Sequence, residues 1–228
     1  SFKTTLSTFA TWTSEEMEML GSRITGMGHF LPDRVVTNDD LAKFLDTTNE
    51  WIVQRTGIEE RRWVCGDVGP ADLAFEATKD ALLEAGLTAS DLDMIIFATL
   101  SPDINFPGSS CILQGMLDIP GIATLDIRNQ CTGFVYGLSI ADQFIKTGMM
   151  KNVLVVGAEV HSSGLDMSDR GRDVTVLFGD GAGVAVVSAT DGESRIIDSK
   201  LHADGTQYDA LMLELPASRL NPRMTAEM

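Results

Sequence analysis

An alternation of helical and strand patterns between residues 72 and 160 limits the fold of this chain more than any other feature. From Asp72 to Ala85, apolar side chains recur every three or four positions, and Gly86 follows as a helix terminator. A continuous apolar run over 94–100 then has the pattern of a buried strand. The two patterns repeat, with helices predicted at 108–117 and 133–148 and strands at 122–127 and 152–160. The order predicts an α/β fold in which a βαβαβ unit forms a mostly parallel sheet covered by helices on both faces.

The segments on either side of this unit have weaker patterns. Before it, we expect a glycine-rich strand over 21–32 and two helices over 38–46 and 49–57. After it, residues 174–189 predict two strands around a tight turn in the sequence GDGAG, and residues 195–205 predict one more strand.

Charge and hydropathy exclude several classes of partner. The 228 residues include 17 Lys and Arg against 33 Asp and Glu, a net charge of −16. Because phosphate backbones and anionic lipids repel such a chain, we expect no nucleic acid and no membrane among its partners. No apolar run approaches the length of a spanning helix, and the first 20 residues lack the pattern of a secretory signal. We therefore expect a cytoplasmic protein.

Metal and dinucleotide sites are not indicated by the sequence. The three cysteines form no CxxC pair, and the three histidines are isolated, so we expect no disulfide framework and no metal site. The GDGAG sequence at 179–183 is not the GxGxxG phosphate-binding pattern, and we interpret it as a structural turn.

Cys131 is the main candidate for chemistry. It follows a predicted strand and lies in the first turn of a predicted helix, where free backbone N–H groups and the positive end of the helix dipole stabilise a thiolate. A thiolate suits covalent acyl transfer, and Gly133 and Gly137 would let the start of the helix pack closely. The alternative is an inert cysteine in the core, since free cysteines are among the most buried residues.

Several separate motifs resemble the N-terminal part of β-ketoacyl-[acyl-carrier-protein] synthase III, of the thiolase-like superfamily. They lie in the family's order between about Ile24 and Pro222, and they are DTTNEWIVQRTGIEERR, SPD, INFPGSSCILQGMLDI, NQCTGFVYGLSIADQFIKTG and DRGRDVTVLFGDGAG. The resemblance implies that Cys131 takes an acyl group from acyl-CoA and condenses it with malonyl-acyl-carrier-protein, with loss of carbon dioxide, to start fatty-acid synthesis. It implies no tightly bound cofactor, since acyl-CoA is a substrate.

The resemblance also implies a set of binding residues. Trp51 and Arg170 match a pair that sandwiches the adenine of coenzyme A, Arg55 matches an arginine at the pyrophosphate, and Thr47 matches a polar contact near the adenine. Phe106 matches a residue that closes the acyl pocket of a dimer partner. From the residues alone, a core role for Trp51 and solvated charges for the arginines are the favoured interpretations, and for Phe106 the alternative is an ordinary core phenylalanine. Arg61 and Arg62 are expected to be a solvated pair, with docking of an acidic carrier protein as the alternative.

The family fold has two similar halves, and the resemblance places only the first half in this chain. Residues 1–20 show no clear periodicity, and we expect them to be an N-terminal extension. The resemblance implies a thiolase-like domain over 21–215, and at 216–228 the start of a linker into a second half that supplies a catalytic histidine and asparagine. Three explanations stay open: a fragment of a longer synthase, a short subunit that works with a complementary half or as a homodimer, and a non-catalytic half that binds coenzyme A or stabilises a dimer. A related thiolase-like acyl transferase is a further alternative.

Overall fold

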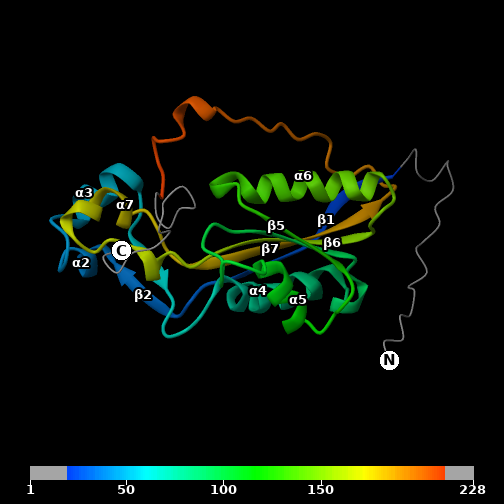
Figure 1. The fold of residues 1–228 in the computed structure, drawn as a ribbon, viewed down its shortest axis with the longest axis horizontal. Coiled ribbons are helices and arrows are strands. Elements are labelled where there is room, and N and C mark those ends of the chain that lie inside the picture. Colours follow the sequence, from blue (N-terminus) through cyan, green and yellow to red (C-terminus); the bar gives the residue numbers. More distant parts are fainter. Residues whose placement is uncertain (1–19, 214–228) are drawn as a thin grey trace.

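A central five-stranded sheet organises the computed structural model, which describes residues 20–213 (Figure 1). Its strand order is β1-β7-β6-β4-β5. β4 pairs in parallel with β5 and β6, whereas β7 pairs antiparallel with β6 and β1. Four strands therefore share one direction, and the sheet is mostly parallel as expected. The bounds are β1 (Gly21–Phe30), β4 (Met94–Ala98), β5 (Ala123–Ile127), β6 (Asn152–Glu159) and β7 (Gly181–Thr190).

Helices cover both faces of this sheet, so the predicted βαβαβ unit is confirmed. α6 (Gly133–Lys146) lies on one face, and α4 (Pro70–Ala85) and α5 (Ser109–Met116) lie on the other (Figure 1). Alternate side chains of β4 serve the two sides: Ile95 and Phe97 join the core under α4, whereas Met94 and Ile96 join the core under α6. A fully apolar strand is required here because both of its faces are buried.

Glycines in β1 allow α4 to lie directly on the strand. A Cβ atom at Gly26 would lie 2.1 Å from the carbonyl oxygen of Ala81, and one at Gly28 would lie 2.0 Å from that of Ala77. Real Cβ atoms do not approach a backbone oxygen so closely, and the opposing alanines are the smallest helix-forming side chains. The glycine-rich character of the first strand is therefore a packing requirement.

A smaller unit sits at one end of the sheet. In it, β2 (Arg34–Thr37) pairs antiparallel with β3 (Glu60–Trp63), and three short helices surround them: α2 (Asn38–Leu41), α3 (Asn49–Thr56) and α7 (Arg172–Thr175). Its core includes Val36, Leu41, Ile52, Trp63 and Val176. The two-stranded sheet could not be predicted from the sequence, because four-residue strands give too few positions to show an alternation.

Three predicted elements are wrong in part. The helix expected over 38–46 ends at Leu41 and continues as a turn. No strand forms over 174–178, where Thr175 and Val176 are both buried; successive side chains of a strand point to opposite faces, so a helical turn serves this site better. The segment 195–205 holds no strand, although the N–H of Ile196 donates to the carbonyl of Ser22 at 2.7 Å.

The GDGAG sequence is not a tight turn. None of Gly179, Gly181 and Gly183 has a positive φ, and β7 begins at Gly181. Between these glycines, the carboxylate of Asp180 is buried and accepts hydrogen bonds from the backbone N–H groups of Val64 (2.8 Å), His161 (2.8 Å) and Ser162 (2.9 Å). The aspartate therefore joins three chain segments at the base of the smaller unit.

Five short 3₁₀ helices complete the described chain, at Ala89–Asp91, Gln130–Thr132, Ser162–Gly164, Asp169–Gly171 and Gly205–Gln207. The expected N-terminal extension, apart from its last residue, and the expected linker over 216–228 lie outside the described residues. Among residues 20–213, no helix has both the length and the apolar character that crossing a membrane requires.

Candidate active site at Cys131 and the Trp51 pocket

Cys131 lies in the short 3₁₀ turn that connects β5 to α6. β5 ends at Ile127, the turn spans Gln130–Thr132, and α6 begins at Gly133. The cysteine is exposed, so the core interpretation of this residue is wrong. The expected position between a strand and a helix is confirmed, but Cys131 lies in a separate 3₁₀ turn before α6 and not in the first turn of that helix.

The turn that carries Cys131 is held in an unusual backbone conformation. Gln130 has a φ of 48°, in the left-handed region that non-glycine residues avoid. The side chains on either side fix it: Asn129 Nδ2 donates to Thr132 Oγ1 at 3.1 Å, and Thr132 Oγ1 donates to the carbonyl of Asn129 at 2.9 Å. Such conformations cost about 1–3 kcal/mol and cluster at functional sites. The strain lies directly beside the candidate nucleophile.

Two glycines set the start of α6 against the sheet. A Cβ at Gly133 would lie 2.9 Å from Cβ of Ala98, and one at Gly137 would lie 2.8 Å from Cγ1 of Val155. Ala98 is the last residue of β4, so the start of α6 lies at the carboxyl edge of the parallel strands, where α/β folds place their ligands. In Figure 1, this end of α6 faces the end of the molecule that holds α3 and α7.

Phe106 lies on the loop between β4 and α5, next to a cis peptide bond to Pro107. Its side chain is 84% exposed, so it is not an ordinary core phenylalanine. Glu159, at the end of β6, ties down the start of this loop by accepting from the backbone N–H groups of Leu100 (2.9 Å) and Ser101 (3.1 Å). The loop therefore presents a large apolar side chain to its surroundings.

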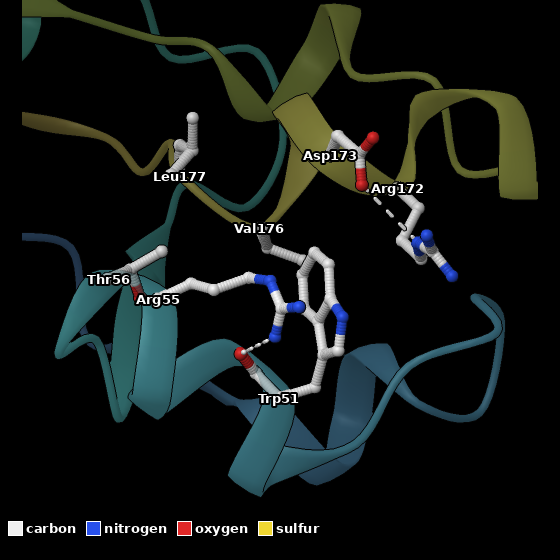
Figure 2. A pocket seen from close by; sticks show the side chains of 7 residues that line it. All are labelled: Trp51, Arg55, Thr56, Arg172, Asp173, Val176 and Leu177. Atoms are coloured by element: carbon white, nitrogen blue, oxygen red, sulfur yellow. Dashed lines mark hydrogen bonds and ion pairs between the residues drawn. The ribbon is translucent and has the colours of Figure 1, made fainter.

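A pocket of about 440 Å³ lies between α3 and α7 (Figure 2). Trp51 and Arg55 come from α3, and Arg172 comes from α7. The guanidinium carbons of Arg55 and Arg172 lie 4.3 and 4.9 Å from the centre of the Trp51 ring. The lining residues are Trp51, Arg55, Thr56, Arg172, Asp173, Val176 and Leu177.

The structure places Arg172, and not the expected Arg170, over the indole. Arg170 is 90% exposed and its Nε donates to Asp166 at 2.8 Å. Arg172 and Asp173 are the first residues of α7, and this helix brings the later arginine to the pocket. The identity of the stacked arginine is thus the point where the motif and the geometry disagree.

Of the other predicted binding residues, Trp51 lines the pocket and Thr47 does not. Trp51 is partly buried against the core of the smaller unit while also lining the pocket, so the two interpretations of it coexist. Thr47 does not line the pocket, and its hydroxyl is buried with no hydrogen-bond partner in the described part of the chain.

Positive charge gathers at this pocket although the chain is acidic overall. Arg172 donates to the carbonyl of Asp46 at 3.0 Å and lies 3.4 Å from the Asp173 carboxylate. Arg55 donates to the carbonyl of Trp51 at 3.4 Å, and within residues 20–213 no carboxylate lies within ion-pair distance of it. Two guanidinium groups beside an aromatic ring suit a ligand with a flat ring and phosphate groups.

The carboxylate of Asp166, in the segment before α7, is held in its ionised form. The hydroxyl and the backbone N–H of Ser168, and then Arg170, donate to Asp166 and lower its pKa to about 2. The carbonyl of Asp166 in turn accepts from Thr175 Oγ1 at 2.7 Å. Asp166 thereby links the two ends of the segment that carries Arg172.

Arg61 is buried, so the expectation of a solvated pair is wrong for this residue. It is 7% exposed, and burial lowers its pKa. Arg62 is the more exposed member and lies 3.7 Å from Glu60.

Comparisons with known proteins agree with this architecture. Residues 125–205 match the family described as 3-oxoacyl-[acyl-carrier-protein (ACP)] synthase III. The chain is 48% identical over 203 residues to β-ketoacyl-[acyl-carrier-protein] synthase III of Caldanaerobacter subterraneus subsp. tengcongensis, covering 89% of this chain and 61% of that protein. It therefore spans about three fifths of the length of this relative.

Solved structures give the same result. The 3-oxoacyl-[acyl-carrier-protein] synthase III of Aquifex aeolicus is similar with a TM-score of 0.78 and 46% identity, over 82% of this chain and 59% of that one. The corresponding synthase III of Pseudomonas aeruginosa gives a TM-score of 0.79 at 36% identity, over 87% and 62%. The predicted thiolase-like α/β fold is confirmed.

Proposed function

This chain is related to β-ketoacyl-[acyl-carrier-protein] synthase III over the part of that protein that it spans, and we propose from this relationship that it takes part in the same acyl-transfer chemistry. The observation that carries the proposal is the exposed Cys131 in a strained turn at the start of α6. Covalent acyl transfer needs a nucleophile that is accessible and held in place, and this turn supplies both.

The proposed first step is acylation of Cys131. Its thiolate attacks the carbonyl carbon of an acyl-CoA thioester, and the electron pair of the C=O bond moves onto oxygen. When the carbonyl re-forms, the C–S bond to coenzyme A breaks and the coenzyme A thiolate leaves, to be protonated by solvent. Backbone N–H groups and the dipole at the start of α6 favour negative charge at this position.

The Trp51 pocket is the proposed site for the nucleotide end of coenzyme A. An adenine stacks favourably on an indole or a guanidinium plane, and arginines pair with phosphate groups. Trp51 and Arg55 keep the roles that the resemblance implies. The resemblance also implies that Thr47 is a polar contact near the adenine, but its buried hydroxyl does not line this pocket. Of the two candidates for the stacked arginine, the geometry favours Arg172 over Arg170.

The later steps depend on groups beyond this chain's described residues. We propose that the acyl group on Cys131 is condensed with malonyl-acyl-carrier-protein, with release of carbon dioxide, when a second half supplies the histidine and asparagine. The exposed Phe106 supports a homodimer in which this side chain closes a partner's acyl pocket. We propose no tightly bound cofactor, because acyl-CoA is a substrate. We expect the protein to act in the cytoplasm.

The domain limits of the chain belong to the same proposal. We take 21–215 as the thiolase-like domain because β1 begins at Gly21 and the matched relatives share this fold.

Acylation can be tested by the intact mass of the protein after incubation with acetyl-CoA. We expect the wild-type chain to gain one acetyl group and the Cys131→Ala variant to gain none. A wild-type chain that is never acetylated but binds coenzyme A would favour the alternative function, a non-catalytic half that binds coenzyme A.

A further inference from the structure

We propose that Arg61 is a positioning residue that sets the spacing between the two walls of the Trp51 pocket and thereby the affinity for the nucleotide end of coenzyme A. The inference rests on the proposed function of that pocket. Arg61 lies on β3 and does not line the pocket itself. Its effect must therefore pass through the residues that it holds.

The Arg61 guanidinium is buried among neutral acceptors. Its Nη1 donates to the carbonyl of Val36 at 3.2 Å, and its Nη2 donates to Asn38 Oδ1 at 2.7 Å and to the carbonyl of Val176 at 3.2 Å. No carboxylate within residues 20–213 lies within ion-pair distance of it. Burying a charge without a counter-ion is costly, so these acceptors must hold the guanidinium firmly. They come from β2, from α2 and from the end of α7.

The bond to Val176 fixes the α7 wall. Val176 is the residue that ends α7, it is 1% exposed, and it lines the pocket four positions after Arg172. A cation that donates to the last carbonyl of a helix stabilises that end. The chain beyond it also rests on β3: a Cβ at Gly179 would lie 3.1 Å from Cβ of Arg61.

The bond to Asn38 reaches the α3 wall. Asn38 is buried, and its Nδ2 donates to Asn49 Oδ1 at 3.0 Å and to the carbonyl of Ile58 at 2.7 Å. Asn49 is the first residue of α3, and Ile58 lies just beyond its last residue. One amide therefore holds both ends of the helix that carries Trp51.

Arg61 is thus hydrogen-bonded to one wall and, through Asn38, to the other. The Arg172 guanidinium lies 4.9 Å from the centre of the Trp51 ring, and a ligand ring that enters there needs both walls at a fixed separation. Loss of Arg61 removes this buried link between the walls, while the hydrogen bonds of Asp46 with Asp169 and Arg172 at the surface remain. The effect should fall on the part of the ligand that binds between α3 and α7.

The test is the binding of two ligands by calorimetry: coenzyme A, and 4′-phosphopantetheine, which lacks the adenine nucleotide. We expect Arg61→Met, which keeps a long unbranched side chain without donors, to raise the Kd for coenzyme A about tenfold, or ~1.4 kcal/mol. The Kd for 4′-phosphopantetheine should stay unchanged. Arg62→Met is the matched control, because Arg62 is the neighbouring residue and pairs with the exposed Glu60, and it should change neither Kd.

Each outcome separates the inference from the function on which it rests. If the folded Arg61→Met chain keeps the wild-type preference for coenzyme A over 4′-phosphopantetheine, the positioning role is overturned. An equal loss of affinity for both ligands would overturn it as well. If the wild-type chain itself binds the two ligands equally, the coenzyme A site is wrong and the inference falls with it. Should Arg61→Met fail to fold, Asn49→Ala removes the hydrogen bond from Asn38 to the start of α3 and leaves the one to the Ile58 carbonyl. This variant should weaken coenzyme A binding selectively, and an unchanged preference would overturn the role.

Discussion

At the scale of single residues, the setting of Cys131 distinguishes it from the other two cysteines. All three cysteines are exposed, so accessibility alone does not select a nucleophile. Cys65 follows β3 in a loop, and Cys111 lies within α5 with its Sγ 3.3 Å from Thr124 Oγ1. Cys131 combines a helix start with the strained φ of Gln130. This combination is the residue-level basis of the proposed chemistry.

The two candidates for the stacked arginine, Arg172 and Arg170, lead to different expected effects of mutation on coenzyme A binding. We expect Arg172→Ala to weaken coenzyme A binding several-fold, because a desolvated stacking contact of this kind contributes about 1–2 kcal/mol. Arg170→Ala is the control and should have little effect, since that side chain points to Asp166. Calorimetric titration of each variant distinguishes them, with Trp51→Ala as the positive control. A larger loss for Arg170→Ala would restore the arginine that the motif indicates.

Asp166 should show an unusual titration. Its pKa is lowered to about 2, chiefly by the hydroxyl and then the backbone N–H of Ser168, so folding favours its ionised form. The stability that this gives is fully present above the ordinary value of 3.8 and is lost as the pH falls through about 2. Ser168→Ala should move the NMR titration midpoint of the Asp166 carboxyl toward 3.8, and a midpoint near 3.8 in the wild type would contradict the account.

At the scale of elements, small residues decide how closely helices approach the sheet. Gly137 in α6 faces Val155 of β6, and Gly26 and Gly28 in β1 face the backbone of α4. The approach is so close that no larger side chain fits without a shift of the helix. Because Cys131 precedes α6 directly, the same packing also sets the position of the candidate nucleophile.

Two helical glycines allow a matched test of this packing. Gly137→Ala puts a Cβ 2.8 Å from the stiff Val155 side chain and should destabilise the fold by about 1–3 kcal/mol. Gly115→Ala in α5 meets nothing within 4 Å and should stabilise it by about 0.5–1 kcal/mol through helix propensity. Urea unfolding of both variants measures the difference. Equal stabilities would show that α6 is not packed against β6 as closely as described.

Periodicity predicted the large elements and missed the small ones, for a physical reason. Long segments such as α4 and α6 bury one continuous face, so their apolar residues repeat many times. The β2 and β3 strands have four residues each, and α7 has four, so their conformation is set by the tertiary core around Trp63 and Val176. Short segments such as 174–178 were therefore assigned the wrong structure.

Some residues of the candidate site could be predicted from the sequence, and others could not. Cys131 could be predicted because its neighbours in sequence are also its neighbours in space. Arg172 and Arg61 could not, since their roles depend on contacts across 121 and 115 residues of sequence, with Trp51 and Val176 respectively. The geometry favours Arg172 over the expected Arg170 as the stacked arginine, and no sequence pattern shows which residue of a short helix faces a distant ring.

At the scale of the whole molecule, an acidic chain carries a pocket lined by two arginines. The net charge of −16 opposes an anionic ligand on average, whereas the guanidinium groups of Arg55 and Arg172 place positive charge beside Trp51. The start of α6 faces the same end of the molecule as this pocket (Figure 1). A ligand with a phosphorylated nucleotide at one end and a thioester at the other suits this arrangement, in which the nucleotide would meet the Trp51 pocket and the thioester would meet Cys131.

The central claim is that acyl-CoA acylates Cys131 selectively, and peptide mapping by mass spectrometry tests it most directly. After brief incubation of the wild-type chain with acetyl-CoA, the acetyl thioester should be found on the peptide that contains Cys131. The peptides of Cys65 and Cys111, which are also exposed, should remain unmodified. Acetylation spread evenly over the three cysteines, or absent from Cys131, would contradict the account.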